Sequence, residues 1–392
     1  MRIVIAGDLS STNLGDPIIC ESVKYLVKDI TGADEDDIKL FDLVNRKKSR
    51  FEESSSEKGF VNETIAIDKT MKRYRKTNLK VLYKWHKHEK RLFDSSFKDM
   101  LCKDDDNIII IAGGALISRS LLYALRLSRI VKIAEKYNAR VIFNAVGCEQ
   151  FDKMDLPHKL MKKALKCKCV SHCSTRDNVD VISRLTKNKD FCKRVPDSGL
   201  FAATAYGIQK QESDTVGIGL ISFQAYKSVA IDEKEVVGMS TIDLFEFWRS
   251  IIDALEKNRQ KWKLFTNGGT NDYELACRFV EYYGYSKEER LMPLPQNPKE
   301  LVEQISTFKA VCVHRLHAAI VSSSLNIKCV PILWSKKVKS FAQMIEAESF
   351  WPQKCYANQV VEQMNLEANT EIINALREES KEFLREAIKN ET

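Results

Sequence analysis

Short apolar runs rich in β-branched residues alternate with amphipathic helical patterns along most of this 392-residue chain. In the first half, the pattern predicts strands at residues 3–6, 108–112 and 140–145 and helices at 17–29, 121–137 and 158–166. In the second half, it predicts strands at 215–221, 262–266, 310–313 and 328–333, with helices at 242–257, 273–283, 298–307 and 367–389. Strands and helices that alternate in this order build parallel sheets from βαβ units. The sequence therefore predicts an α/β protein.

The length of the chain predicts two domains, because a single hydrophobic core rarely extends over so many residues. We expect an N-terminal Rossmann-like domain at 1–205 and a C-terminal one at 206–392, which includes the terminal helix, with the polar stretch 206–214 as linker. A charged segment at about 45–106 interrupts the alternation, and we interpret it as a basic, helical insertion in the first domain. Two doubly wound domains that face each other across a cleft are the simplest arrangement.

The composition describes a globular protein, with 44% hydrophobic and 30% charged residues and no apolar run that approaches the length of a membrane span. The first eight residues become polar too soon for a signal peptide and suit a first strand. Eleven cysteines without a secretory signal predict free thiols in a reducing compartment. We therefore expect a cytoplasmic protein.

The net charge of +8 is concentrated in residues 69–91, where ten lysines or arginines stand against one glutamate. A solvated helix face is the simplest interpretation of this segment, which also contains leucine and aromatic side chains. Peripheral contact with the anionic inner face of a membrane is the second interpretation, and contact with nucleic acid is the third. We expect no nucleic-acid partner.

The junction between the expected strand at 309–313 and the following helix reads His314-Arg315-Leu316-His317. Polar side chains at the carboxyl end of a buried strand lie where open α/β sheets bind ligands. Arg315 offers a planar fork to a carboxylate or phosphate, and His317 can carry a proton near neutral pH. The alternative is an arginine–histidine pair that only caps the helix. We expect an anion site, because the position and the residue types agree.

A second strand-to-helix junction holds Asn13 and Asp16. A helix N-terminus at this point, together with the Asn13 amide, could hold an anion or a sugar hydroxyl. Asp16 at the N-cap and Pro17 at the first helical position would equally explain the segment as a plain helix start.

Gly113 and Gly114 end the apolar strand at 108–112, where a ligand can approach the backbone closely. Arg176 follows a further short strand, and we expect its side chain to point into the cleft. Neither a GxGxxG nor a GxxxxGK[ST] motif occurs, which disfavours enzymes driven by dinucleotides or nucleotide hydrolysis. The cysteines between 167 and 173 lack the paired spacing of a zinc site, so we expect no metal.

Five segments, in this order along the chain, resemble motifs of the polysaccharide pyruvyl transferase family. They are Asn13-Leu14-Gly15-Asp16, Gly113-Gly114, Ser174-Thr175-Arg176-Asp177, Gly217-Ile218-Gly219-Leu220 and Arg315-Leu316-His317-Ala318. Lys337, after a strand that contains Pro331, also agrees. The resemblance spans about residues 3–345. The basic insertion and Ala115, where the family often has a third glycine, depart from the pattern.

The resemblance implies a GT-B-like fold and a pyruvyltransferase that uses phosphoenolpyruvate as co-substrate, with no other cofactor. Its product would be a pyruvate ketal across two hydroxyls of a sugar in a polysaccharide or a lipid-linked glycan precursor, as in capsule or exopolysaccharide biosynthesis. Phosphate would be released. Arg315, Arg176 and Lys337, with Gly113 and Gly114, would bind the donor anions.

The resemblance also implies roles on the side of the acceptor. His317 would act as a general acid or base, with Arg315 beside it, and Asp16 would act as a base toward the acceptor. Asn13 and Asp16 would bind the sugar. Two alternatives keep the fold: a GT-B glycosyltransferase that uses a nucleotide sugar, and a non-catalytic relative that binds anions or sugars.

Overall fold

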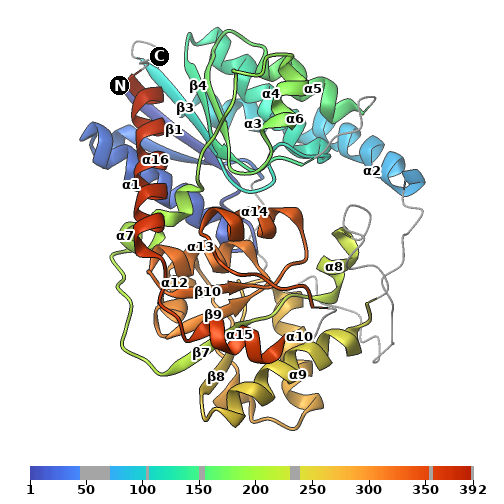
Figure 1. Ribbon diagram of the computed structural model, residues 1–392. Coiled ribbons are helices and arrows are strands. Elements are labelled where there is room, and N and C mark those ends of the chain that lie inside the picture. The colour runs from blue at the N-terminus through green and yellow to red at the C-terminus, as the bar shows by residue number, and fades with distance from the viewer. Residues whose placement is uncertain (45–70, 103–105, 150–154, 230–238, 353–355, 390–392) are drawn as a thin grey trace.

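The computed structural model describes residues 1–44, 71–102, 106–149, 155–229, 239–352 and 356–389. It contains two lobes, each built on a β-sheet with helices on both faces (Figure 1). The first sheet has six described strands and the second has four, and all the pairs between them are parallel. This architecture confirms the predicted α/β fold of two doubly wound units.

The first sheet has the strand order β2-β1-β3-β4-β5-β6. Its strands are β1 (Arg2–Gly7), β2 (Ile38–Asp42), β3 (Asn107–Ala112), β4 (Arg140–Val146), β5 (Val170–Thr175) and β6 (Lys193–Arg194). The connecting helices are α1 (Gly15–Thr31), the short η1 (Glu35–Asp37), α4 (Leu121–Lys136), α5 (Leu156–Leu165) and α6 (Val179–Thr186). Ile3 and Ile5 pack against α1, whereas Val4 between them faces the core under α4. Because both faces are covered, the central strands are nearly continuous apolar runs.

The second sheet has the strand order β10-β9-β7-β8. Its strands are β7 (Thr215–Gly219), β8 (Lys261–Phe265), β9 (Ala310–Val313) and β10 (Lys328–Pro331). The helices around it are α8 (Phe223–Val229), α9 (Thr241–Lys257), α10 (Thr270–Tyr282), α11 (Lys287–Arg290), α12 (Pro298–Ser306), α13 (Leu316–Ser324), α14 (Lys336–Met344) and α15 (Ala357–Met364). Val216 and Ile218 face the core under α9, and Val311 faces the core under α12 and α13.

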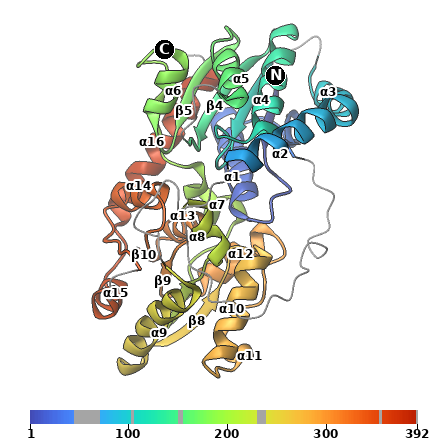
Figure 2. The same ribbon diagram turned by 90° about the vertical axis from the view of Figure 1, so that its right-hand side faces the viewer.

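Helices, rather than strands, join the two lobes. After β6 the chain forms η3 (Ser198–Phe201) and α7 (Ala202–Tyr206), and residues 207–214 lead to β7 (Figure 2). Leu14 of α1's N-cap and Leu200 of η3 lie in the same buried cluster as Ile320 of α13. Gly199 allows this approach, because a Cβ there would lie 2.9 Å from Cγ2 of Ile320. The packing sets the N-terminus of α1 against that of α13.

The terminal helix, expected in the C-terminal domain, contacts both lobes and buries its last turns against the first. Helix α16 (Thr370–Lys389) runs alongside α1 in Figure 1, and its last turns lie at the first lobe, as does the N-terminus. Its Phe383 and Leu384 belong to the core on the first sheet. Arg140 of β4 donates to the carbonyls of Ala387 at 3.1 Å and Ile388 at 2.8 Å. The sequence shows an apolar stripe but not which lobe the stripe contacts.

The predicted insertion is helical where the structure describes it. It forms α2 (Met71–Lys84), a π-helical turn (Trp85–Glu89) and α3 (Lys90–Lys98). Trp85 packs against Leu121 and Leu125 of α4. Residues 45–70 and 103–105 lie outside the described residues, and so do the side chains of 71–77.

Two strands were not predicted, and both lie at the edges of the first sheet. β2 contains the charged residues Lys39 and Asp42 among its five residues, so its sequence does not show a clear apolar pattern. β6 has only two residues, and both are exposed. Edge strands of this kind carry too little buried apolar sequence to be recognised.

Truncation of Leu384 tests the position of the terminal helix. Leu384 is 0% exposed, so Leu384→Ala should lower the free energy of unfolding by about 2–5 kcal/mol. Glu379→Ala, at an exposed position of the same helix, is the control and should change it by less than about 0.5 kcal/mol. Urea unfolding followed by circular dichroism measures both. Equal midpoints for the two variants would exclude α16 from the core.

Candidate functional site

A pocket of about 500 Å³ opens between the lobes, at the carboxyl ends of strands from both sheets. The loops after β1 and β3, where the order of the first sheet reverses, form part of its wall. The wall includes Asn13, Asp16, Gly114, Tyr123, Glu149, Arg176, Asp177, Arg315, His317, Trp334, Lys336 and Lys337. Of the site residues predicted from the sequence, all except Gly113 line this pocket.

Three helices begin at the pocket wall, namely α1, α13 and α14. Their first N–H groups lack partners within the helix and carry partial positive charge. Asp16 is not the N-cap of α1, as one interpretation of the sequence proposed, because the helix begins at Gly15 with Leu14 as its N-cap. The Asp16 carboxylate is therefore available to the pocket.

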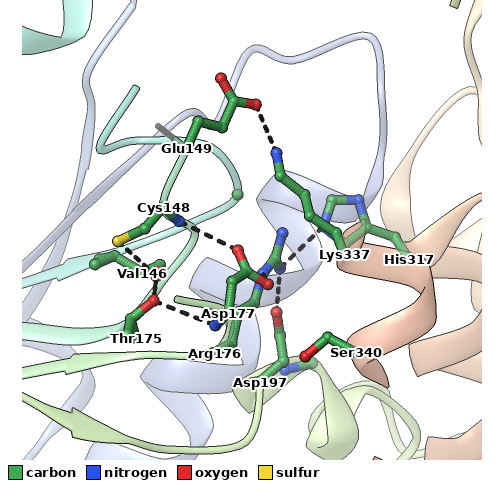
Figure 3. A network of polar contacts seen from close by, with 12 residues as sticks. Val146, Cys148, Glu149, Thr175, Arg176, Asp177, Asp197, His317, Lys337 and Ser340 are labelled. Carbon is green, nitrogen blue, oxygen red and sulfur yellow. Dashed lines mark hydrogen bonds and ion pairs between the residues drawn. The ribbon is translucent and has the colours of Figure 1, made fainter. Parts of the chain in front are cut away.

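The imidazole of His317 lies where the two lobes touch. It rests on Gly15, because a Cβ at that position would lie 2.0 Å from Cγ of the ring. Its Nε2 lies 3.3 Å from Nη1 of Arg176 (Figure 3), and its Nδ1 lies 3.3 Å from the Asn13 amide. Arg176 can only donate, so Nε2 accepts and Nδ1 carries the ring proton. The protonated Nδ1 can donate to Asn13 when the amide is oriented with Oδ1 toward the ring. Oδ1 of Asn13 is buried and has no other partner among the described residues.

The environment of His317 keeps its ring neutral. Burial and the charges of Arg176, Arg315 and Lys337 lower the pKa of His317 well below its ordinary value. The neutral ring is therefore not a general acid near neutral pH in the free protein. An anionic ligand beside the same cations would raise the pKa of His317.

Asp16 faces the pocket from the first turn of α1. Its Oδ1 accepts from the N–H of Gly114 at 3.0 Å, and its Oδ2 accepts from Oγ of Ser11 at 3.2 Å. Burial and the negative charge of Asp8 raise the pKa of Asp16 to about 6, although the charge of Arg176 opposes them. A carboxyl group with this pKa can exchange a proton near neutral pH.

Arg176 is a fixed, buried cation at the end of β5. Its Nη1 donates to Asp197, and its Nε lies 3.7 Å from Oδ1 of Asp177 (Figure 3). Asp197 is itself held by the N–H of Gly199 at 2.7 Å. Burial disfavours the charge of Arg176, but the two carboxylates outweigh it and raise the pKa of Arg176. The side chain is thus oriented before any ligand binds.

Arg315 is already engaged by a carboxylate. Its Nε and Nη2 each donate to Asp272 at 2.8 Å, in a bidentate pair. Asp272 is 1% exposed and also accepts from the N–H of Ser222 at 2.8 Å. The guanidinium carbon lies 5.8 Å from the ring centre of Trp334. This pairing uses two of the three nitrogens and leaves Nη1 for a ligand.

Lys337 reaches across the pocket from the start of α14. Its Nζ lies 2.6 Å from Oε1 of Glu149 in the first lobe (Figure 3). Both side chains are partly exposed, so the pair contributes at most about 1 kcal/mol. Gly113 lies behind the wall: its carbonyl accepts from the N–H of Gly147 at 3.1 Å, and its φ of 148° suits glycine.

Several residues of the wall were not predicted as site residues, among them Asp177, Glu149 and Trp334. The sequence favours Asp177 as a helix cap, but Asn178 caps α6, and Asp177 accepts from the N–H of Cys148 at 3.1 Å. Glu149 and Trp334 each follow the end of a strand by three residues. Their position at the carboxyl edge of a sheet is the signal that could have identified them.

His314 belongs to the core of the second lobe. Its Nε2 contacts the hydroxyl of Tyr226, and its ring lies 4.8 Å from that of Trp248. Burial lowers the pKa of His314 well below its ordinary value. The residue does not line the pocket.

Two further properties concern only the described residues. None of their His, Cys, Asp and Glu side chains form a group of three or more that could hold a metal ion. No helix within these ranges has both the length and the apolar content needed to cross a bilayer.

Two parallel sheets with a pocket between them define a GT-B fold, and solved structures agree. UDP-GlcNAc 2-epimerase from Methanocaldococcus jannaschii, in complex with UDP-GlcNAc and UDP, is similar with a TM-score of 0.54 and 11% identity over 99% of each chain. A putative UDP-N-acetylglucosamine 2-epimerase from Listeria monocytogenes is similar with a TM-score of 0.54 and 7% identity, over 99% of this chain and 96% of that one. At this identity the likeness concerns the fold alone.

The family model of polysaccharide pyruvyl transferases matches residues 13–336. The chain belongs to the polysaccharide pyruvyl transferase family, as the five motifs predicted. A comparison with curated proteins gives no significant match.

The raised pKa of Asp16 predicts a pH-dependent contribution to stability. Its folded-state value is about 6 against 3.8 in the unfolded chain, so the contribution is complete below 3.8 and is lost as pH rises through 6. The difference in unfolding free energy between the wild type and Asp16→Asn should fall by about 2 kcal/mol from pH 4 to pH 7, because solvent in the pocket screens part of the shift. Urea unfolding at each pH measures it, with exposed Asp190→Asn as control. A difference independent of pH would show that Asp16 has an ordinary pKa.

Proposed function

We propose that the protein transfers the pyruvyl group of phosphoenolpyruvate to a sugar, and forms a pyruvate ketal across two hydroxyls with release of phosphate. The family supports a transferase that acts on a sugar or polysaccharide. The observation that carries the choice of donor is the charge of the pocket. Arg176, Arg315 and Lys337 line the pocket together with Asp16, whose pKa is about 6, and α13 and α14 begin at the same wall.

The donor places two demands on such a pocket. Phosphoenolpyruvate carries a carboxylate and a phosphate on the same carbon atom, C2, so two anions must be held side by side. Lys337 and the first turn of α14 suit one of them, and Arg176 with the first turn of α13 suits the other. Glu149 would release Lys337 at little cost, because their ion pair is partly exposed.

The reaction balances with two hydroxyl groups and one donor. C2 of the donor forms two bonds to acceptor oxygens, and its bond to the phosphate oxygen breaks. The methylene carbon C3 gains one proton and becomes a methyl group. One of the two hydroxyl protons is transferred to C3. The other is taken up by the departing phosphate, which leaves as hydrogen phosphate.

Asp16 and His317 divide the proton transfers in this proposal. Asp16 is mostly ionised at neutral pH and takes the proton of the attacking hydroxyl, while Asn13 holds the sugar. His317 is neutral in the free protein and becomes protonated once the donor's anions compensate Arg176 and Lys337. The imidazolium then gives a proton to C3 or to the departing phosphate.

Phosphate release from phosphoenolpyruvate, with a panel of aryl hexosides as acceptors, tests this function. Asp16→Asn should lower kcat by about 10²- to 10⁴-fold, because it removes a general base. Its affinity for phosphoenolpyruvate, followed by the fluorescence of Trp334 and the other tryptophans, should change little. The wild-type kcat/KM should fall as pH drops below about 6.

Exposed Asp190→Asn is the matched control and should keep the wild-type rate. Absence of phosphoenolpyruvate binding would contradict the proposal whatever acceptor is used. Consumption of UDP-GlcNAc in place of phosphoenolpyruvate would favour the nucleotide-sugar alternative.

A further inference from the structure

The helical insertion exposes large apolar side chains to solvent. Leu79 is 68% exposed, Tyr83 61% and Leu92 71%. They account for three of the seven large apolar side chains that are exposed in the described part of the chain, yet they lie within 14 residues. A helix face whose only role is contact with solvent is not expected to expose three large apolar side chains so close together.

Basic side chains share this exposed side. Lys80, Lys87 and Arg91 are all exposed. We use the name insertion face for these three residues together with Leu79, Tyr83 and Leu92. Nζ of Lys87 lies 2.7 Å from the Tyr83 hydroxyl, so a cation and an aromatic ring are presented together.

The carboxylates of the same segment are engaged in ion pairs. Glu89 pairs with Arg126 of α4 at 2.9 Å and with the exposed Lys84 at 2.9 Å, and Asp94 pairs with Arg129 of α4. From residue 78 to residue 98 these are the two acidic residues in the chain. Both carboxylates are therefore neutralised by ion pairs, and neither belongs to the insertion face.

The segment is held firmly to the wall of the pocket. Trp85 is 3% exposed and packs on Leu121 and Leu125 at the start of α4. Tyr123, on the same turn of α4, lines the pocket. Helix α2 projects from the side of the first lobe in Figure 1. The insertion face and the pocket thus share one supporting helix.

We propose that the insertion face docks the protein on the surface of an anionic phospholipid membrane. Leucine and tyrosine side chains enter the boundary between headgroups and acyl chains, while lysine and arginine bind the anionic headgroups. Nucleic acid would use the cations but offers no apolar layer for two leucines that are about 70% exposed. Docking would hold the pocket near a lipid-linked acceptor, and this use of the membrane rests on the proposed function.

Co-sedimentation of the full chain with vesicles tests the docking. Wild-type protein should bind vesicles of phosphatidylcholine with phosphatidylglycerol, but not vesicles of phosphatidylcholine alone. The triple change Lys80→Glu, Lys87→Glu and Arg91→Glu should lower the partition coefficient at least about a hundredfold, because attraction becomes repulsion. The double change Leu79→Ser and Leu92→Ser should lower it by about tenfold or more.

A second triple change serves as the matched control. Lys257→Glu, Lys299→Glu and Lys309→Glu alter the net charge equally, at exposed positions of the second lobe, and should leave most of the binding intact. All insertion-face variants should bind phosphoenolpyruvate as the wild type does. A docking failure is thereby distinguished from a failure of the proposed function, which would leave vesicle binding unchanged.

Three results would overturn the docking proposal. The first is absence of wild-type binding to the anionic vesicles. The second is an equal loss of binding in the control triple variant. The third is binding to single-stranded RNA that the leucine-to-serine variant retains while vesicle binding is absent, which would assign the face to nucleic acid.

Discussion

The contact between His317 and Gly15 is the constraint on which the pocket depends. A glycine at the first position of α1 lets the imidazole of the second lobe lie directly on the first lobe. The same contact brings Asn13 and Arg176 of the first lobe to the two ring nitrogens, and it places Asp16 beside them. A side chain at position 15 would separate these groups. The junction of the lobes is therefore also the centre of the chemistry.

Each of the two arginines at this junction is balanced by a buried carboxylate. Asp197 holds Arg176 and Asp272 holds Arg315. Removal of one partner from such a pair commonly costs about 3–5 kcal/mol, because the other charge is left buried and alone. The pairs fix the cations in place and still leave enough positive potential to lower the pKa of His317. A bound anion would therefore change the protonation of the ring.

The sequence predicted the central strands and most of the pocket wall, because both depend on local pattern. Strands such as β3 are apolar from their second residue on, and the residues that follow them in the chain lie at one edge of the sheet. The partners of Arg176 and Arg315 were not predictable, because Asp197 and Asp272 are 21 and 43 residues away in the chain. The docking of α16 on the first lobe was missed for the same reason: an apolar stripe does not specify what it contacts.

Titration calorimetry of phosphoenolpyruvate binding tests the central claim, that donor anions convert His317 from a neutral ring to a proton donor. Binding heats at pH 7 in two buffers of different ionisation enthalpy give the number of protons taken up. The wild type should take up more protons per molecule than His317→Asn, because burial and the nearby cations lower the pKa of the ring and the donor's anions oppose the cations. Equal proton uptake by the two proteins would contradict this account.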